Sequence, residues 1–299
     1  MKSLPQILLS IALGCALLNN CHAANGSIRV VASDLFSGTM VSTLEAFAAN
    51  NLDTPLRINL SGSLDALEAL DSDKADLAIV AIPENAMPLS TDYTLVPFTF
   101  IVTVVVVSDL NPLTEINFSQ LQGIYADSEE FSYTRWGELD SSEVWENRLI
   151  QPLALKQPGN LAFEMFCTLA LNRISLKSNV TLATNKEALR ELMLNDPSMI
   201  AVVDRIPDLK SVRSLSIVPS ETEAVGFDPT SDNVFYGDYP LRLPIYLVFE
   251  TEKKLLLRPY LSFLFSDRVI DQLQSEGFMK LSKNLIKSTL DELDILTEN

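Results

Sequence analysis

Short apolar runs alternate with polar turns and amphipathic stretches in the first third of the chain. Residues 28–32 and 56–60 have the apolar and β-branched composition of strands, and residues 40–48 and 64–70 then place apolar side chains at helical spacing. A third apolar run follows at residues 75–81. Strands that alternate with helices predict an α/β fold with a mainly parallel central sheet flanked by helices.

The most β-branched stretch of the chain lies at residues 98–107 and is longer than an ordinary strand. Its length predicts one extended segment that crosses from one lobe of a two-lobed protein to the other. Residues 239–249, which contain two prolines, predict an extended segment that returns. Further strands are predicted at residues 149–155 and 199–203, and helices at residues 161–171, 187–194, 256–276 and 283–296.

The N-terminal residues have the composition of a secretory signal peptide. Lys2 precedes an apolar run over residues 4–18 that contains no acidic side chain, and small side chains follow at Cys21 and Ala23. The run is shorter than the roughly 20 apolar residues that span a bilayer, so an uncleaved anchor fits this segment less well. We therefore predict a signal peptide over residues 1–23 and a periplasmic location for the rest of the chain.

The net charge and the histidine content limit the partners and the catalytic groups that this protein can have. The chain has 22 basic and 39 acidic residues and a formal net charge of −17, which argues against a nucleic acid or an anionic membrane surface as partner. Its one histidine, His22, would leave with the signal peptide, and Cys167 would be the one cysteine left. Catalysis by a Ser-His-Asp or Cys-His group is thereby excluded. We predict that the protein is not an enzyme and has no catalytic residue, metal site or cofactor.

Three turns between a predicted strand and a predicted helix hold the candidate ligand-binding residues. Open α/β sheets bind ligands at the carboxyl ends of their strands, and unpaired backbone NH groups at helix N-termini can receive an oxyanion there. The alternative is that the same Ser, Asp and Asn side chains only cap helices. The candidates are Ser33, Asp34 and Leu35 in the first turn, Ser61, Gly62 and Ser63 in the second, and Lys156, Gly159 and Asn160 in the third.

Motifs spread along the chain resemble the phosphate-binding proteins of bacterial ABC uptake systems. Residues 28–47 resemble that family's first strand, Ser/Thr loop and helix, and residues 61–78 resemble its second loop followed by an ADIG-like strand. Residues 111–136, 239–249 and 275–278 are similar to its segments with the patterns NP…NW, YPL…PLY and GF. The order and spacing of these motifs carry the resemblance, because no single motif is specific.

The sequence departs from this family where phosphate would bind. Asp34 stands where the family has a hydroxyl, and its carboxylate would repel a phosphate dianion. In the third turn, Ala154 stands where the family has an arginine, and Lys156 supplies charge without the bidentate guanidinium group. These departures leave open whether phosphate binds at all. A neutral, zwitterionic or cationic solute is more compatible with Asp34.

The resemblance implies the periplasmic-binding-protein type II fold, with a solute bound in the cleft between two lobes. Lobe one is expected to comprise residues 24–103 and 217–299, and lobe two residues 104–216. By the same resemblance, the protein would be a monomer that delivers a small molecule or an oxyanion to an inner-membrane ABC permease. The alternative is a non-transporting sensor or interaction subunit that docks on a membrane protein. An enzyme is a third possibility, for which only carboxylate or lysine chemistry remains.

Overall fold

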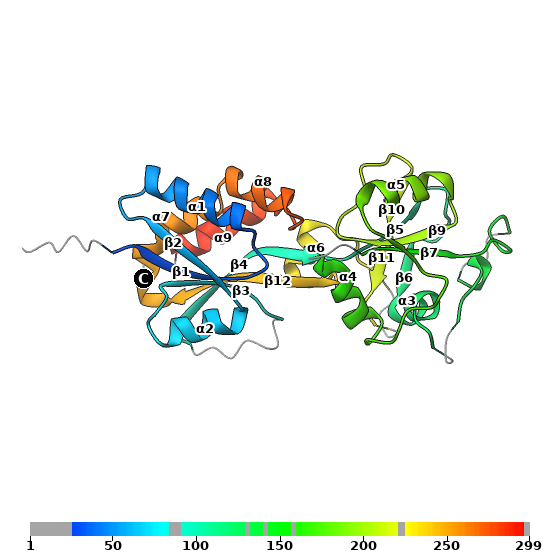
Figure 1. Cartoon of the computed structure of the whole chain (residues 1–299), viewed down its shortest axis with the longest axis horizontal. Helices are drawn as coiled ribbons and strands as arrows, with labels where there is room; N and C mark the ends of the chain where they lie inside the picture. Colours follow the sequence, from blue (N-terminus) through cyan, green and yellow to red (C-terminus); the bar gives the residue numbers. More distant parts are fainter. Residues whose placement is uncertain are drawn as a thin grey trace, which may run out of the picture.

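Two lobes lie next to each other along the long axis of the molecule, and each is built around a five-stranded sheet (Figure 1). The computed structural model describes residues 26–83, 91–128, 132–139, 143–156, 160–220 and 225–295. The signal peptide predicted over residues 1–23 lies outside the described residues. The two-lobed α/β fold predicted from the sequence is confirmed.

The lobe-one sheet has the strand order β2-β1-β3-β12-β4. Strand β1 runs parallel to β2 and β3, as predicted, whereas β12 pairs antiparallel with β3 and β4. The antiparallel pairs arise because β12 returns from lobe two and inserts between β3 and β4. The strands are β1 (Ile28–Ser33), β2 (Leu56–Ser61), β3 (Leu77–Ala81), β4 (Tyr93–Val102) and β12 (Arg242–Glu250).

Helices cover both faces of this sheet (Figure 1). Leu67 and Leu70 of α2 pack in one apolar cluster with Val80 of β3. Ile79, the preceding residue of β3, belongs to the main core on the opposite face, because successive side chains of a strand alternate between faces. Helices α1, α7, α8 and α9 contribute to that core. The helices of lobe one are α1 (Gly38–Asn51), α2 (Ser63–Asp71), α7 (Lys254–Leu264), α8 (Asp267–Ser275) and α9 (Lys283–Ile295).

The lobe-two sheet repeats this mixed pattern with the order β10-β5-β9-β7-β8. Strand β7 is parallel to β8 and β9, whereas β5 is antiparallel to β9 and β10. The strands are β5 (Val104–Ser108), β7 (Gln151–Leu155), β8 (Thr181–Ala183), β9 (Met199–Val203) and β10 (Val212–Ser214), and β6 (Glu115–Asn117) pairs separately with β11 (Ser216–Val218). The helices are α3 (Phe118–Tyr125), α4 (Leu161–Met165) with a π-helical continuation (Phe166–Ala170) and α5 (Lys186–Asn195). Helix α6 (Ser231–Tyr236) follows β11 in the chain, and its Phe235 ring meets Phe100 of β4 in lobe one, with centroids 6.2 Å apart.

Two predicted elements are divided in the structure. The strand predicted over residues 98–107 is two strands, β4 and β5, which meet at Thr103 and belong to different sheets. The prediction of one helix over residues 256–276 is wrong, because α7 and α8 are separated at Ser266. Ser266 has an extended backbone and is the N-cap residue of α8, so the chain changes direction between the two helices.

Thr103 lies where the chain crosses between the lobes, and its backbone and side chain are both hydrogen-bonded within the protein. Its NH donates to the Leu241 carbonyl at 2.9 Å, and its hydroxyl donates to the Ala162 carbonyl at 2.7 Å. The Tyr239 hydroxyl donates to the Thr103 carbonyl at 2.7 Å. Thr103 and Tyr239 are both completely buried, and burial raises the pKa of Tyr239. The first crossing is thereby tied to α4 and to the segment that leads into β12.

Replacing Tyr239 with phenylalanine is expected to lower the free energy of unfolding by about 1–2 kcal/mol, because the buried Thr103 carbonyl loses its donor. Urea unfolding would measure this loss. The matched control is Tyr236→Phe, since Tyr236 is 68% exposed, and it should change stability by no more than about 0.5 kcal/mol. Equal unfolding midpoints for the Tyr239→Phe and Tyr236→Phe variants would contradict a structural role for this hydrogen bond.

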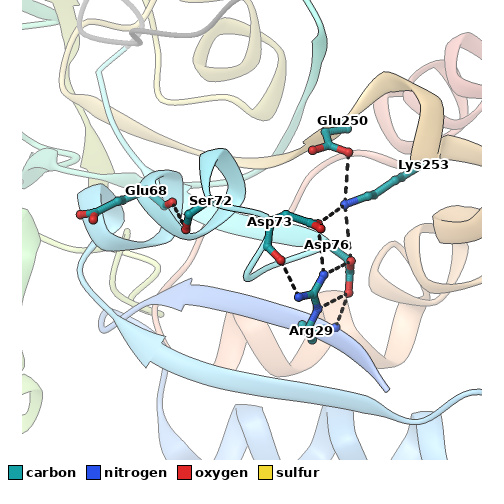
Figure 2. A network of polar contacts seen from close by, with 7 residues as sticks. All are labelled: Arg29, Glu68, Ser72, Asp73, Asp76, Glu250 and Lys253. Carbon is teal, nitrogen blue, oxygen red and sulfur yellow. Dashed lines mark hydrogen bonds and ion pairs between the residues drawn. The ribbon is translucent and has the colours of Figure 1, made fainter. Parts of the chain in front are cut away.

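Five charged side chains form a network where β1 begins and β12 ends (Figure 2). The Arg29 guanidinium donates from Nε and Nη2 to the two carboxylate oxygens of Asp76, at 3.0 and 2.7 Å. Lys253 forms ion pairs of 3.1 Å with both Asp73 and Glu250. The Asp76 side chain is 13% exposed, whereas the Asp73 side chain is 77% exposed. The network fixes the turn between α2 and β3 against β1.

Candidate functional site

A cavity of about 250 Å³ lies between the two lobes. Lobe one lines it with the loop that follows β1 and the turn that follows α8, and lobe two lines it with the first residues of α4 and α5 and the residues after β9. The cavity therefore meets the carboxyl ends of β1 and β9, where open α/β sheets bind ligands. The lining residues are Leu35, Ile101, Asn160, Leu161, Ala162, Lys186, Asp204, Arg205, Ser275, Glu276, Gly277 and Phe278.

The turn after α8 is fixed by a glycine and by a pair of stacked rings. The Phe278 NH donates to the Leu273 carbonyl at 3.1 Å. The Gly277 NH donates to the Gln274 carbonyl at 3.2 Å, which completes the two hydrogen bonds of a Schellman motif. Gly277 has φ +103°, a conformation that glycine adopts without strain. The Phe278 ring stacks on Phe36 with centroids 5.1 Å apart, so the turn is held against the loop that precedes α1.

Glu276 is the C-cap residue of α8, and its carboxylate points at the start of α1. The Ser37 hydroxyl donates to Glu276 Oε1 at 2.7 Å, and the Ser37 NH donates to Oε2 at 3.4 Å. Gln272 Nε2 donates to Oε1 at 2.9 Å. Ser37 is the N-cap residue of α1, and α1 has no acidic residue in its own first turn. The negative charge beside the N-terminus of α1 therefore comes from α8, and the helix dipole of α1 stabilises it.

Asp204 lies between two cations on the lobe-two wall of the cavity. Its Oδ2 atom is 2.8 Å from Lys186 Nζ and 3.8 Å from Arg205 Nε. A Cβ atom at Gly277 would lie 3.6 Å from Arg205 Nη2 and 3.7 Å from Asp204 Oδ2. The charged side chains of lobe two thus approach the backbone of lobe one closely at Gly277.

A second cavity, also of about 250 Å³, shares four lining residues with the first. The shared residues are Asp204, Arg205, Gly277 and Phe278. Its other walls include Val102 at the end of β4 and Val104 at the start of β5. The space between the lobes is therefore divided into two hollows where Asp204 and Arg205 approach Gly277.

The charges that line the first cavity balance. Its described lining carries two cations, Lys186 and Arg205, and two carboxylates, Asp204 and Glu276, so its formal charge is 2 − 2 = 0. The cations and Asp204 lie on lobe two, whereas Glu276 lies on lobe one. A doubly charged anion would enter without a compensating net positive charge, whereas a neutral or zwitterionic solute would meet both a cationic and an anionic wall.

Two of the predicted ligand-binding turns reach this cavity. Leu35 and Asn160 line it, one from each lobe. Asn160 also caps α4, because its Oδ1 accepts from the Ala162 NH at 3.0 Å. Ser33 is buried and its Oγ accepts from the Leu35 NH at 3.4 Å, whereas the neighbouring Asp34 is exposed.

The other described candidates of the second and third turns are not among the lining residues. Ser61 Oγ donates to Asp65 at 2.6 Å, and Ser63 Oγ accepts from the Ala81 NH at 3.0 Å. Gly62 is the N-cap residue of α2. Lys156 is exposed and its ammonium lies 5.6 Å from the centre of the Phe163 ring. Gly159 lies outside the described residues. Ligand binding by these five residues stays a prediction.

None of the charged residues that line the cavity is among the ligand-binding candidates predicted from the sequence. Glu276 carries a signal, because a carboxylate directly before the glycine that ends a helix is disfavoured by that helix's dipole. Asp204 and Arg205 directly follow the apolar strand β9, the position where ligands meet an open sheet. Lys186 carries a similar signal, because a cation in the first turn of α5 is disfavoured by that helix's dipole.

In the described part of the chain, no three His, Cys, Asp or Glu side chains gather in a group that could hold a metal ion. None of the helices in this part of the chain combines the length and the apolar character that a membrane crossing requires.

Comparisons with known proteins point to one superfamily and one fold. The family model described as "PBP superfamily domain" matches residues 21–268. No curated protein matches the sequence. Among solved structures, "a possible phosphate binding protein from Planctomyces limnophilus DSM 3776" is similar, with 18% identity, a TM-score of 0.62 and coverage of 90% of this chain and 98% of that one.

Two further structures share the fold. PstS from Borrelia burgdorferi has 15% identity and a TM-score of 0.64 over 86% of this chain and 99% of that one. An ABC-type phosphate transport receptor from Vibrio cholerae has 17% identity and a TM-score of 0.53 over 85% of this chain and 99% of that one. At such identities the likeness establishes the two-lobed fold and leaves the ligand to be argued from the cavity.

Proposed function

Because this chain belongs to the PBP superfamily, and because a cavity lies between its lobes, we propose that it is an exported solute-binding protein that binds a small solute in that cavity. The observation that carries the proposal is the lining of the cavity. Polar side chains reach it from both lobes, Glu276 from one and Asn160, Lys186 and Arg205 from the other. A solute bound there would contact both lobes at once.

Binding of a solute that contacts both lobes would change the relative position of the two lobes. A solute that touches both walls binds the closed arrangement more tightly than an open one and shifts the population towards closure. In this proposal lobe one comprises residues 24–103 and 217–299, and lobe two residues 104–216. The crossing at Thr103 and the return to lobe one after β11 would act as the hinge.

The proposal includes export and a membrane partner. The signal peptide predicted over residues 1–23 would direct the chain to the periplasm, and an inner-membrane ABC permease would receive the solute. The names of the structural neighbours, a possible phosphate binding protein and a phosphate transport receptor, support an uptake role. The balanced charges of the cavity favour a neutral or zwitterionic solute over phosphate.

One observation favours a non-transporting sensor as the second candidate. Glu276 already uses the donors of Ser37 at the start of α1, so part of the polar surface of the cleft is satisfied without a solute. A sensor subunit would need only weak binding or none, and would act through contacts of its acidic surface with a membrane protein. Solute-dependent stabilisation distinguishes the two functions, because only the uptake protein requires it.

A thermal-shift screen of the exported protein tests the uptake function. The panel comprises phosphate and other oxyanions, amino acids, polyamines and sugars, and calorimetry confirms each hit. We expect saturable stabilisation by one solute class. We also expect the shift to disappear in a Leu35→Trp variant, whose larger side chain fills the cavity. A Leu255→Trp variant is the matched control, because Leu255 is exposed on α7 and does not line the cavity.

Two results would contradict the proposal. The absence of a shift with every solute of the panel would favour the sensor function. A shift that survives the Leu35→Trp substitution would place solute binding outside the interlobe cavity.

A further inference from the structure

The N-terminus of α1 is hydrogen-bonded to a carboxylate of the protein itself, and that carboxylate belongs to a residue of the cavity lining. α1 is 14 residues long and begins at the loop whose Leu35 lines the cavity. The Glu276 carboxylate accepts from both the hydroxyl and the NH of Ser37, its N-cap residue. Glu276 also lines the cavity. A carboxylate from 239 residues further along the chain thus occupies a helix N-terminus, a position at which oxyanions can bind.

The position of Glu276 is not explained by its own helix. It caps the C-terminus of α8, where the helix dipole disfavours a negative charge. The Schellman turn at Gly277 and the stacking of Phe278 on Phe36 direct the carboxylate towards α1, whose dipole has the opposite sign. Gln272, one turn earlier in α8, donates a further hydrogen bond at 2.9 Å. The backbone and three polar groups therefore hold the carboxylate in one place.

The hydrogen bonds between Glu276 and Ser37 have two consequences for an oxyanion that enters the cavity. The Ser37 donors are already used, so the oxyanion would have to displace a charged, well-bonded acceptor. The negative charge of Glu276 also brings the formal charge of the described lining from +1 to 0, because Lys186 and Arg205 otherwise outnumber Asp204. Both consequences act against phosphate and only weakly against a neutral solute.

We propose that Glu276 is a specificity-determining residue of the cleft, an internal carboxylate that excludes inorganic phosphate and other multiply charged oxyanions. This inference rests on the proposed solute-binding function and specifies the solutes that the cleft rejects. It places the exclusion at Glu276, whose carboxylate is fixed at α1 and lines the cavity, whereas the exposed Asp34 is not among the lining residues.

Calorimetric titration with inorganic phosphate, in a buffer free of other oxyanions, tests the proposal. The Glu276→Ala variant is expected to bind phosphate about tenfold to a hundredfold more tightly than the wild type, the effect of one charge-assisted hydrogen bond gained and one repulsion removed. The matched control is Glu252→Ala, which removes the same charge from an exposed residue between β12 and α7. That control should bind phosphate as the wild type does.

A second variant keeps the test decisive if alanine at this position disturbs the fold. Glu276→Gln keeps the size and the carbonyl acceptor while it removes the charge, and it should show a smaller gain in phosphate affinity in the same direction. Circular dichroism and the melting temperature of each variant establish that it is folded before titration.

Phosphate affinities that agree within about threefold among the wild type, Glu276→Ala and Glu276→Gln would overturn the proposal, whether all three bind or none does. This failure is separate from failure of the proposed function. A wild type stabilised by another solute of the panel, together with variants that gain no phosphate affinity, would retain solute binding and reject the role of Glu276.

Discussion

Replacing Trp136 with alanine is expected to lower the free energy of unfolding by about 3–5 kcal/mol. Trp136 is 1% exposed, and its ring meets Trp145 edge to face, with centroids 5.8 Å apart and planes at 89°. Its Nε1 donates to the Ser198 carbonyl at 3.1 Å, at the turn that precedes β9. Alanine would leave a large void and would remove one of the two donors to that carbonyl, which also accepts from the Gln151 NH at 3.1 Å. The irregular segment around Trp136 would lose its main anchor.

Urea unfolding followed by circular dichroism measures this effect, because removal of a tryptophan changes the fluorescence signal itself. The matched control is Val144→Ala, since Val144 lies close by in the sequence and is 74% exposed; it should change stability by no more than about 0.5 kcal/mol. A loss below about 1 kcal/mol for the Trp136→Ala variant would mean that the segment is held by other contacts.

Replacing Asp76 with asparagine should cause the second large loss, about 2–3 kcal/mol. The Asp76 carboxylate accepts from three donors of Arg29: Nε at 3.0 Å, Nη2 at 2.7 Å and the backbone NH at 2.9 Å. The loss stays below that of a fully buried ion pair because the Arg29 side chain is 43% exposed.

The Asp73→Asn variant is the matched control for this network. Asp73 contacts the same two cations, Arg29 and Lys253, but its side chain is largely exposed and screened by solvent, so its loss should be clearly smaller than that of the Asp76→Asn variant. Asparagine also tolerates the positive φ of +51° at this residue. Equal losses for the Asp73→Asn and Asp76→Asn variants would contradict the view that burial gives the Asp76 contact its strength.

The difference between the wild type and the Asp76→Asn variant should depend on pH. Burial alone would raise the pKa of Asp76, but the Arg29 hydrogen bonds and the charge of Lys253 outweigh it and hold that pKa below its ordinary value. The unfolded chain, with an Asp pKa of about 3.9, therefore binds the proton first as the pH falls. The stability difference should be complete above about pH 5 and shrink below about pH 4. A difference that is constant from pH 3 to pH 7 would contradict this ionic contribution.

Most elements of the fold could be predicted because their signals are local. The strands β1, β2 and β3 are short runs rich in apolar residues, β1 and β2 end in polar turns, and α1 and α2 show one apolar stripe each. The break between β4 and β5 could not be predicted, since Thr103 is β-branched like its neighbours and is equally buried. The break between α7 and α8 was missed because apolar residues continue through it, although Ser266 and Asp267 together have the composition of a helix start.

The candidate site was harder to predict from the sequence than the elements of the fold, because its residues are far apart in the chain. Leu35 and Asn160 were found through the turns that hold them, since each turn follows a strand. The contact of Glu276 with Ser37 joins residues 239 positions apart, and no periodicity connects them. The ion pairs of Asp204 with Lys186 and Arg205 depend in the same way on how α5 meets the end of β9.

Hydrogen exchange with and without a saturating solute from the screen tests the central claim most directly. We predict that the solute slows amide exchange in both lobes together, around Leu35 and Glu276 in lobe one and around Asn160 and Arg205 in lobe two. Such protection would establish that the solute lies between the lobes and joins them. Protection confined to one lobe, or to residues remote from the cavity, would contradict binding in the interlobe cavity.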